Sequence, residues 1–251
     1  MMSYVFSHKI APTIFLENLC LSFGRDVLFH NMNLTIASGK WTCLLGASGV
    51  GKTTLLKLIA GLIPNPFFQG NIRCDNKIAS AQQVAYMAQT DLLQPWLTAL
   101  DNALLGHRLR GSYSNTVLAQ AKKLFAQVGL KGAEKKFPDQ LSGGMRQRVA
   151  LVRTLLEEKS IVLMDEPFSA VDAITRFQLQ TLAAELLQNR TVLLVTHDPL
   201  EALRLGNDIY ILSGAPVKAD HVMQLENAIP RSMDDPDFIK YQRTLFNALN
   251  L

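Results

Sequence analysis

The sequence predicts an α/β fold built around a mostly parallel sheet, and three observations support this prediction. Short, continuous apolar runs at 41–45, 161–164 and 192–195 recur along the chain, and such runs are typical of parallel strands buried on both faces. Segments with helical spacing separate them. The first run leads directly into a glycine-rich loop and then a helix, which is how α/β proteins often begin a ligand site.

Length and composition restrict the class of protein further. The 251 residues suffice for one large domain or two lobes. The net charge of +4 comes without a basic run, so nucleic acid is not an expected partner. Cys20, Cys43 and Cys74 lack ligand-like spacing, which favours a reducing compartment over disulfides or zinc. No apolar stretch reaches the ~18 residues of a membrane span. Met1–Ile10 lacks a signal-peptide core, so we expect a soluble cytoplasmic chain.

Residues 14–23 and 27–36 predict the first two strands, joined by a turn at 24–26. Apolar and polar residues alternate along the first strand, and Phe23 continues the apolar series. Two interpretations stay open for Phe23: it is one more core residue, or its ring stacks on an adenine.

The loop after the run at 41–45 matches the G-x-x-x-x-G-K-[ST] pattern of phosphate-binding loops. Its glycines let backbone N–H groups point at an anion, Lys52 adds positive charge near the outer phosphates, and the Thr53 hydroxyl is placed for Mg²⁺. A helix expected over 52–60 aims the positive end of its dipole at the same place and ends at Gly61. We therefore predict a nucleotide-binding loop formed by Gly46, Ala47, Ser48, Gly49, Val50, Gly51, Lys52, Thr53 and Thr54.

The middle of the chain changes from short strands to helices. A turn-rich passage at 64–70 precedes a strand pair near 71–78, and a strand at 84–88 ends at Gln89. A helical region follows from about 98 to 159, in which Thr98 and Asp101 form a plausible capping box.

Two amphipathic helices are expected within this region. Apolar residues fall on one face of the first, and Gly129 is its expected C-cap: Val117, Ala121, Leu124, Phe125 and Val128. The second helix opens at Ser142 and has its own apolar face: Met145, Val149, Val152 and Leu156.

Strands and helices alternate again in the last third. The runs at 161–164 and 192–195 and the segment 208–212 predict strands. The tail from Gly214 is less periodic, although 238–251 fits a closing helix.

Four of the predicted strands end in polar or glycine-rich residues, and ligands of open α/β sheets bind at the carboxyl ends of strands. The four ends are Gly46, Gln89, Asp165–Glu166 and His197, and we interpret them as one site. Asp165 is placed to hold the Mg²⁺ shell, and Glu166 is the best candidate to act as general base toward water. Gln89 completes the metal shell or is a plain polar strand cap. His197 contacts the terminal phosphate and holds Glu166 in line, or it is structural.

Ser142 opens its helix as an N-cap, with the bare amides of Gly143 and Gly144 beside it. This end is a second anion site on a different helix from the first. Two phosphate-binding ends in one chain suggest that each nucleotide lies between two chains.

This ordered set of motifs resembles the ATP-binding subunit of an ABC transporter over nearly the whole chain, and Leu141–Met145 (Leu-Ser-Gly-Gly-Met) is the most specific part. The resemblance implies ATP hydrolysis with Mg²⁺, with Thr53, Gln89 and Asp165 at the metal and Glu166 and His197 as catalytic residues. It also implies that Phe23 stacks on adenine. In a homodimer, Ser142, Gly143, Gly144 and Met145 would close on the partner's ATP, and Ser169–Asp172 would cross the interface. Met145 and Val171 replace the more usual Gln and Leu, which the family tolerates.

The resemblance further implies a phosphate-loop NTPase fold in one domain over residues 1–251. Its RecA-like core, with an antiparallel β subdomain, would comprise about 1–90 and 160–220, and an inserted helical subdomain about 91–159. The C-terminal tail would begin at about 214.

Two segments resemble the subgroup of bacterial importers for nitrate, sulfonates, taurine and hydroxymethylpyrimidine: Leu92–Asn102 and the tail around 230–238. This implies two transmembrane permease subunits, an extracytoplasmic binding protein and a peripheral position on the cytoplasmic face of the membrane. Trp96 is either core or an anchor for the permease. One alternative is an ABC ATPase of a non-import complex, such as lipoprotein release or cell division. The other, a DNA-repair or translation protein, is disfavoured because the chain has neither a long coiled coil nor a duplicated cassette.

Overall fold

The computed structural model describes residues 11–63, 68–75, 77–78 and 83–249. A six-stranded central sheet has the order β10-β9-β3-β8-β7-β6, and its strands are parallel except for β10, which pairs antiparallel with β9. The expected mostly parallel sheet is confirmed. Its strands are β3 (Trp41–Gly46), β6 (Val84–Met87), β7 (Ile161–Asp165), β8 (Thr191–Val195), β9 (Asp208–Ser213) and β10 (Lys218–Gln224).

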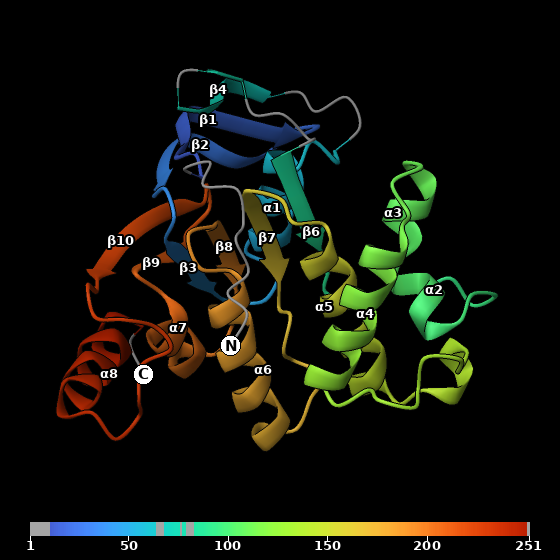
Figure 1. Cartoon of the computed structure of the whole chain (residues 1–251). Coiled ribbons are helices and arrows are strands. Elements are labelled where there is room, and N and C mark those ends of the chain that lie inside the picture. Colours follow the sequence, from blue (N-terminus) through green and yellow to red (C-terminus); the bar gives the residue numbers. More distant parts are fainter. Residues whose placement is uncertain (1–10, 64–67, 76, 79–82, 250–251) are drawn as a thin grey trace.

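A second, antiparallel sheet covers the central one and appears at the top of Figure 1. It has the order β2-β1-β4-β5. Its strands are β1 (Ile14–Phe23), β2 (Asp26–Ile36), β4 (Phe68–Cys74) and β5 (Lys77–Ile78). The expected antiparallel β layer is therefore present.

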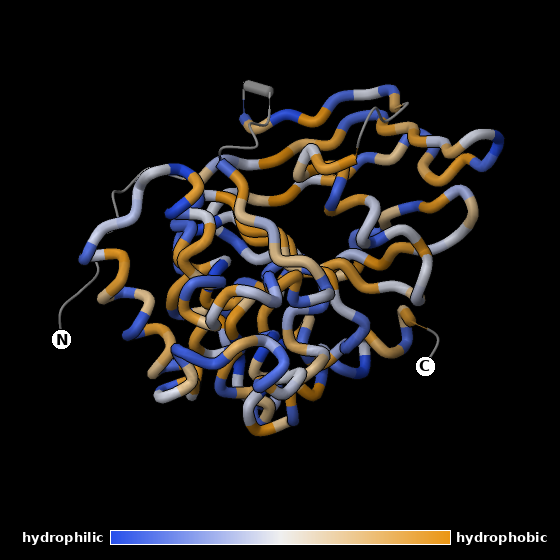
Figure 2. Tube along the Cα trace, turned by 90° about the vertical axis from the view of Figure 1, so that its right-hand side faces the viewer, coloured by the Kyte–Doolittle hydropathy of each residue, from blue (hydrophilic) through white to orange (hydrophobic). Residues whose placement is uncertain are grey.

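The central strands are buried on both faces, as their unbroken apolar runs predicted. In β7, Val162 and Met164 belong to the core on the helical side, whereas Ile161 and Leu163 belong to the core toward the antiparallel sheet. Successive side chains of a strand point to opposite faces, so one short run supplies two cores. Figure 2 shows these inner segments as largely hydrophobic.

The helices cover the central sheet and its ends. Figure 1 shows α2, α3 and α4 (green) gathered beside β6, and both α2 and α4 pack on α5. The helices are α1 (Lys52–Ile59), α2 (Ala99–Ala103), α3 (Leu105–Leu109), α4 (Asn115–Gln127), the 3₁₀ turn η2 (Pro138–Gln140), α5 (Gly143–Leu156), α6 (Ala173–Leu186), α7 (Pro199–Leu205) and α8 (Pro236–Ala248). Within the described ranges, no helix combines the length and apolarity that crossing a membrane requires.

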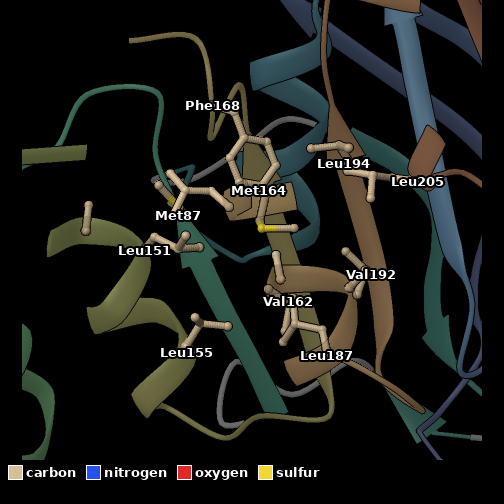
Figure 3. Close-up of a cluster of buried hydrophobic side chains, with 14 of the residues drawn as sticks. Met87, Leu151, Leu155, Val162, Met164, Phe168, Leu187, Val192, Leu194 and Leu205 are labelled. Carbon is tan, nitrogen blue, oxygen red and sulfur yellow. The ribbon is translucent and has the colours of Figure 1, made fainter. Parts of the chain in front are cut away.

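Helix α5 lies directly against the sheet. Figure 3 shows Leu151 and Leu155 on α5 facing Met87 of β6 and Val162 of β7. The apolar face expected for α5 is confirmed: Val149, Val152 and Leu156 are buried, and the half-buried Met145 packs on the same core. The buried residues of α1 and α5 belong to different cores, so the two helices predicted to bind phosphate lie on opposite sides of the central sheet.

Polar side chains determine where several helices begin. The backbone N–H of Asp101 donates to Thr98 Oγ1 (3.2 Å), and the Thr98 hydroxyl donates to the Asp101 carboxylate (2.8 Å). The expected cap at Thr98 is thus confirmed, although the reciprocal bond goes to the hydroxyl rather than to the backbone. Gly129 follows α4 with a φ of 69°, as a C-terminal glycine should.

Some sequence predictions need correction. Residues 68–70 of the expected turn-rich passage are part of β4, while 64–67 lie outside the described residues. The tail after Gly214 contains a strand, β10, that was not predicted. Most of its residues are partly or fully exposed, so it lacks the alternation that reveals a half-buried strand. Helix α8 begins at Pro236 rather than 238, because Asp235 caps it. The segment 1–10, where a signal peptide was excluded, is also outside the described residues.

We expect Leu151→Ala to lower the free energy of unfolding by about 2–5 kcal/mol, because it leaves a cavity between α5 and β6. Leu151 is only 1% exposed. The matched control is Leu109→Ala on α3, where the leucine is 79% exposed and the change should stay within about 0.5 kcal/mol. Urea titration followed by circular dichroism measures both variants, and equal effects would contradict this assignment of the core.

Candidate functional site

The four polar strand ends predicted from the sequence do meet at one edge of the central sheet. Strands β3, β8, β7 and β6 are neighbours, and Asp165 at the end of β7 pairs with Val195 at the end of β8. The Glu166 N–H donates to the Val195 carbonyl (2.9 Å), and the Thr196 N–H donates to the Leu44 carbonyl (3.1 Å). Backbone pairing therefore continues just past the strands and holds the site residues in register.

The phosphate loop requires glycine at two points in particular. A Cβ on Gly46 would lie 2.6 Å from the Leu212 carbonyl oxygen of β9, which excludes any side chain there. Gly51, with a φ of 109°, caps α1 in a left-handed conformation. The Leu55 N–H already donates to the Gly51 carbonyl (2.9 Å), so α1 begins directly behind the loop. The expected order of strand, loop and helix is confirmed.

Lys52 lies folded under the loop. Its ammonium group donates to the carbonyls of Gly46 (2.7 Å) and Ala47 (2.8 Å), and the residue is only 6% exposed. Burial lowers the pKa of Lys52, while the carboxylates of Glu166 and Asp165 oppose this shift. The ammonium group is thus held inside the concave side of the loop, ready for an anion.

The carboxylate at the end of β7 fits a magnesium ligand. Asp165 is 1% exposed, and its Oδ2 has no hydrogen-bond partner among the described residues. Burial is the largest effect on the pKa of Asp165 and raises it. A hydrogen bond with the Thr53 side chain opposes this shift. A buried, unpartnered carboxylate oxygen is costly unless a cation or donor joins it. Mg²⁺ typically takes one or two protein oxygens together with substrate phosphates, so Thr53 and Asp165 fit that ion.

Glu166 is held by two neighbouring strand ends. Its Oε2 lies 3.0 Å from His197 Nδ1 and accepts a longer bond, 3.4 Å, from Gln89 Nε2. Glu166 has a φ of 47°, an uncommon conformation for this residue type and one that often marks functional positions. The structure therefore brings Gln89, Glu166 and His197 together as the sequence predicted.

The second predicted anion site also has the expected local structure. Ser142 caps α5 by accepting a bond from the Met145 N–H (3.2 Å). Ser142 and Gly143 are exposed, and a Cβ on Gly144 would approach the Ala170 carbonyl to 3.1 Å. Asp172 caps α6 through the Thr175 N–H (3.0 Å), and that bond lowers the pKa of Asp172. Among the described residues, no hydrogen bond joins the Ser142 end of α5 to the phosphate loop.

Phe23 is 53% exposed at the end of β1, so the core interpretation of this residue is wrong. The alternation of buried and exposed residues along β1 ends at Phe23, the last residue before the turn to β2. Trp96 is likewise not core, since it is 70% exposed. Both aromatic rings are available to a partner or ligand.

Sequence reasoning did not find every residue around this edge. A cavity of about 620 Å³ lies beside the phosphate loop, and Ala248 and Leu249 at the end of α8 form part of its wall together with Ala47, Ser48 and His197. No local pattern in the tail indicated this approach. Asp91, two residues after Gln89, also went unnoticed, as did its contacts with Arg146 and Arg153 of α5.

These features define a class of protein: a phosphate loop, a buried carboxylate beside its threonine and a water-accessible glutamate belong to phosphate-loop nucleoside triphosphatases. The family model described as "ABC transporter" matches residues 29–169, more than half of the chain. The chain belongs to the ABC transporter family, and it is an ATPase that uses ATP and Mg²⁺.

Individual proteins show the same similarity. An uncharacterized ABC transporter ATP-binding protein of Haemophilus influenzae is 42% identical, over 93% of this chain and 97% of that protein. The aliphatic sulfonates import ATP-binding protein SsuB of Bacillus subtilis is 39% identical, over 85% of this chain and 84% of that protein. A dimeric ATP-binding cassette solved in a post-hydrolysis state with ADP and Pi has a TM-score of 0.76 and 29% identity, over 85% of this chain and 99% of that chain.

We expect Asp165→Asn to stabilise the nucleotide-free protein while removing its response to Mg²⁺ and ATP. Because burial raises the pKa of Asp165 in the folded protein, ionising this carboxyl lowers stability as the pH rises above the ordinary aspartate pKa. It costs nothing at pH values low enough to protonate the carboxyl in both states. At pH 8 the variant should therefore melt at a higher temperature than the parent. The difference should shrink as the pH falls toward the ordinary aspartate pKa of 3.8 and vanish well below it.

Scanning fluorimetry with and without Mg²⁺ and ATP measures both effects. The parent should gain thermal stability on adding the two ligands together, and the variant should gain much less. Asp234→Asn, at an exposed position in the tail, is the control. A lower melting temperature for Asp165→Asn at pH 8 would show that the buried carboxylate is not under strain.

Proposed function

We propose that this chain is the ATP-hydrolysing subunit of an importer for a small nutrient and that the edge residues described above divide the catalytic work. The loop from Gly46 to Thr54 surrounds the phosphates with backbone N–H groups, and Lys52 leaves its two carbonyl partners to contact the outer phosphates. Phe23 contributes an exposed ring for the adenine.

Thr53 and Asp165 hold the metal. Gln89, which donates to Glu166, completes the ligand shell of the metal. When bound, Mg²⁺ neutralises charge on the phosphate oxygens. The unpartnered Asp165 Oδ2 supports this role most directly.

Glu166 accepts the proton of the attacking water. His197 and Gln89 contact the same oxygen, Oε2, so they orient the carboxylate and leave Oε1 for water. Since His197 remains 59% exposed, it is also free to meet the terminal phosphate. The cluster of three side chains from three strand ends is the observation that carries this assignment.

A second copy of the chain completes each site. Ser142, Gly143, Gly144 and Met145 form a helix start that is exposed at Ser142 and Gly143. Among the described residues it has no hydrogen bond to its own phosphate loop. We infer that it closes on the ATP of the partner chain and that Asp172 lies at the interface. The similarity to a dimeric cassette supports this arrangement.

Glu166→Gln should keep ATP binding but lose turnover by at least about 100-fold, because glutamine cannot accept the proton. The same variant should dimerise when ATP is added, since unhydrolysed ATP remains between the two chains. A coupled phosphate-release assay measures turnover, and sedimentation velocity measures dimerisation.

Glu226→Gln is the control, because Glu226 is exposed and follows β10 at the end that pairs with Asp208, opposite the sheet edge that holds Gly46. It should match the parent in both assays. Turnover at the parent rate in Glu166→Gln would refute the general-base assignment. A monomer at saturating ATP would refute the two-chain site.

Within the importer class, we propose a sulfonate or a chemically similar anion as the nutrient, with nitrate, taurine and hydroxymethylpyrimidine as the other members of the predicted group. Several relatives at 36–40% identity are named as aliphatic sulfonates importers. Two permease subunits would bind near the exposed Trp96 at the cytoplasmic face of the membrane, and an extracytoplasmic binding protein would deliver the nutrient. We also propose the division into a core with its β layer, a helical subdomain over about 91–159 and a tail from about 214.

A strain that lacks this gene should lose growth on an alkanesulfonate as sole sulfur source and keep growth on sulfate. Growth on taurine, nitrate and a hydroxymethylpyrimidine is tested in parallel, and complementation with Glu166→Gln should fail. Undiminished growth on every sulfonate, with a defect on another compound of the group, would reassign the nutrient without affecting the ATPase.

A further inference from the structure

The loop that follows Gln89 is fastened to α5 by two arginines. Arg146 Nε donates to Asp91 Oδ2 (2.9 Å). Arg153 donates to two backbone carbonyls of the same loop, Asp91 (2.7 Å) and Leu92 (3.1 Å). Residues seven apart share one face of a helix, so a single face of α5 holds the loop.

Asp91 is the centre of this fastening. Its Oδ1 accepts from the Leu93 N–H (3.1 Å), while Oδ2 accepts from Arg146. Leu92, which lies between Asp91 and Leu93, has a φ of 49° and is 58% exposed. A left-handed conformation is unusual for leucine, and no packing of its side chain accounts for it. The bonds of Asp91 and Arg153 therefore impose the shape of this loop.

The loop and the arginine that holds it contact two different parts of the candidate ATP sites. Gln89, two residues before Asp91, donates to Glu166 in the catalytic cluster. At the other end, Arg146 Nη1 donates to the carbonyl of Leu141 (3.0 Å), directly before the cap Ser142. A continuous series of contacts thus joins Glu166 in one ATP site to the helix start that serves the partner's ATP.

We propose that Asp91 and Arg146 form a positioning pair that couples the two ATP sites of the dimer. A change at Gln89, caused by the occupant of its own site, moves Asp91, and Arg146 transfers the displacement to Leu141 and Ser142. This inference rests on the proposed two-chain site. Neither residue touches ATP, so both act through the groups they position.

The solvent exposure of the Asp91–Arg146 pair favours a positioning role over a purely structural one. The side chains of Arg146 and Asp91 are 36% and 28% exposed, and ion pairs with such solvent access contribute little to folding stability. In contrast, Arg146 also holds the Leu141 carbonyl (3.0 Å), directly before the helix start at Ser142. Removal of the pair should therefore disturb dimer closure more than it disturbs the fold.

The test uses the Glu166→Gln chain with ATP and combines Asp91→Asn, Arg146→Gln and the double variant. Asparagine keeps an oxygen for the Leu93 N–H, so it removes the charge pair without removing the turn. We expect ATP binding to the monomer to stay within about twofold and the dimerisation constant to weaken about tenfold, within the usual range of coupling between sites. The double variant should be no weaker than Arg146→Gln alone, because both single variants remove the same Asp91–Arg146 interaction.

Arg110→Gln is the matched control. It breaks another ion pair of similar exposure, Arg110 to Glu157 (2.7 Å), at the far end of α5, and it should leave dimerisation unchanged. Arg146→Lys retains the charge but loses the fork that reaches both Asp91 and Leu141, so it should fall between parent and Arg146→Gln. Melting temperatures confirm that all variants are folded.

The outcomes separate this inference from the proposed function. If Glu166→Gln dimerises with ATP but the single variants match it, or if their effects add in the double variant, the positioning pair is refuted and the two-chain site stands. If Glu166→Gln fails to dimerise at all, the proposed two-chain site is refuted, and the coupling falls with it.

Discussion

The parallel pairing of β3, β8, β7 and β6 is the constraint on which the site depends. Because these strands run in the same direction and are neighbours, their carboxyl ends form one edge. Their register is strongly specified, since each strand contributes to a core on both faces and a one-residue shift would exchange the two sets of side chains. Residues as distant in sequence as Gly46, Gln89, Asp165 and His197 are therefore placed together by the packing of hydrophobic side chains far from the nucleotide.

That edge also concentrates groups that the fold does not satisfy. Asp165 is buried with an unpartnered oxygen, Lys52 is desolvated under its loop, and Glu166 adopts a left-handed conformation. Each arrangement costs folding free energy that the large double-sided core offsets. A metal ion and phosphates would give partners to Asp165 and Lys52, which is a physical reason to regard these two groups as fitted to a ligand rather than as defects.

Helix α5 connects this edge to the rest of the molecule in three ways. Its buried face packs on β6 and β7, its start presents Ser142, and its arginines hold the loop after Gln89. Gln147 adds a direct bond to the Pro167 carbonyl (3.1 Å), just past Glu166. One helix thus contacts the strand ends of the candidate site and carries the surface that we propose to face a partner chain, which is the basis of the coupling proposed above.

The sequence by itself determined the parallel strands of the central sheet, the phosphate loop, the starts of α2 and α5 and which polar residues meet at the ends of those strands. These features depend on local signals: unbroken apolar runs, glycines with a required spacing and capping side chains. Only the tertiary structure decided that Phe23 and Trp96 are exposed, that β10 extends the sheet, that α8 borders the cavity beside the phosphate loop and that Asp91 meets Arg146. Exposure, edge pairing and ion pairing depend on residues distant along the chain, and no pattern within a short window records where those residues will be.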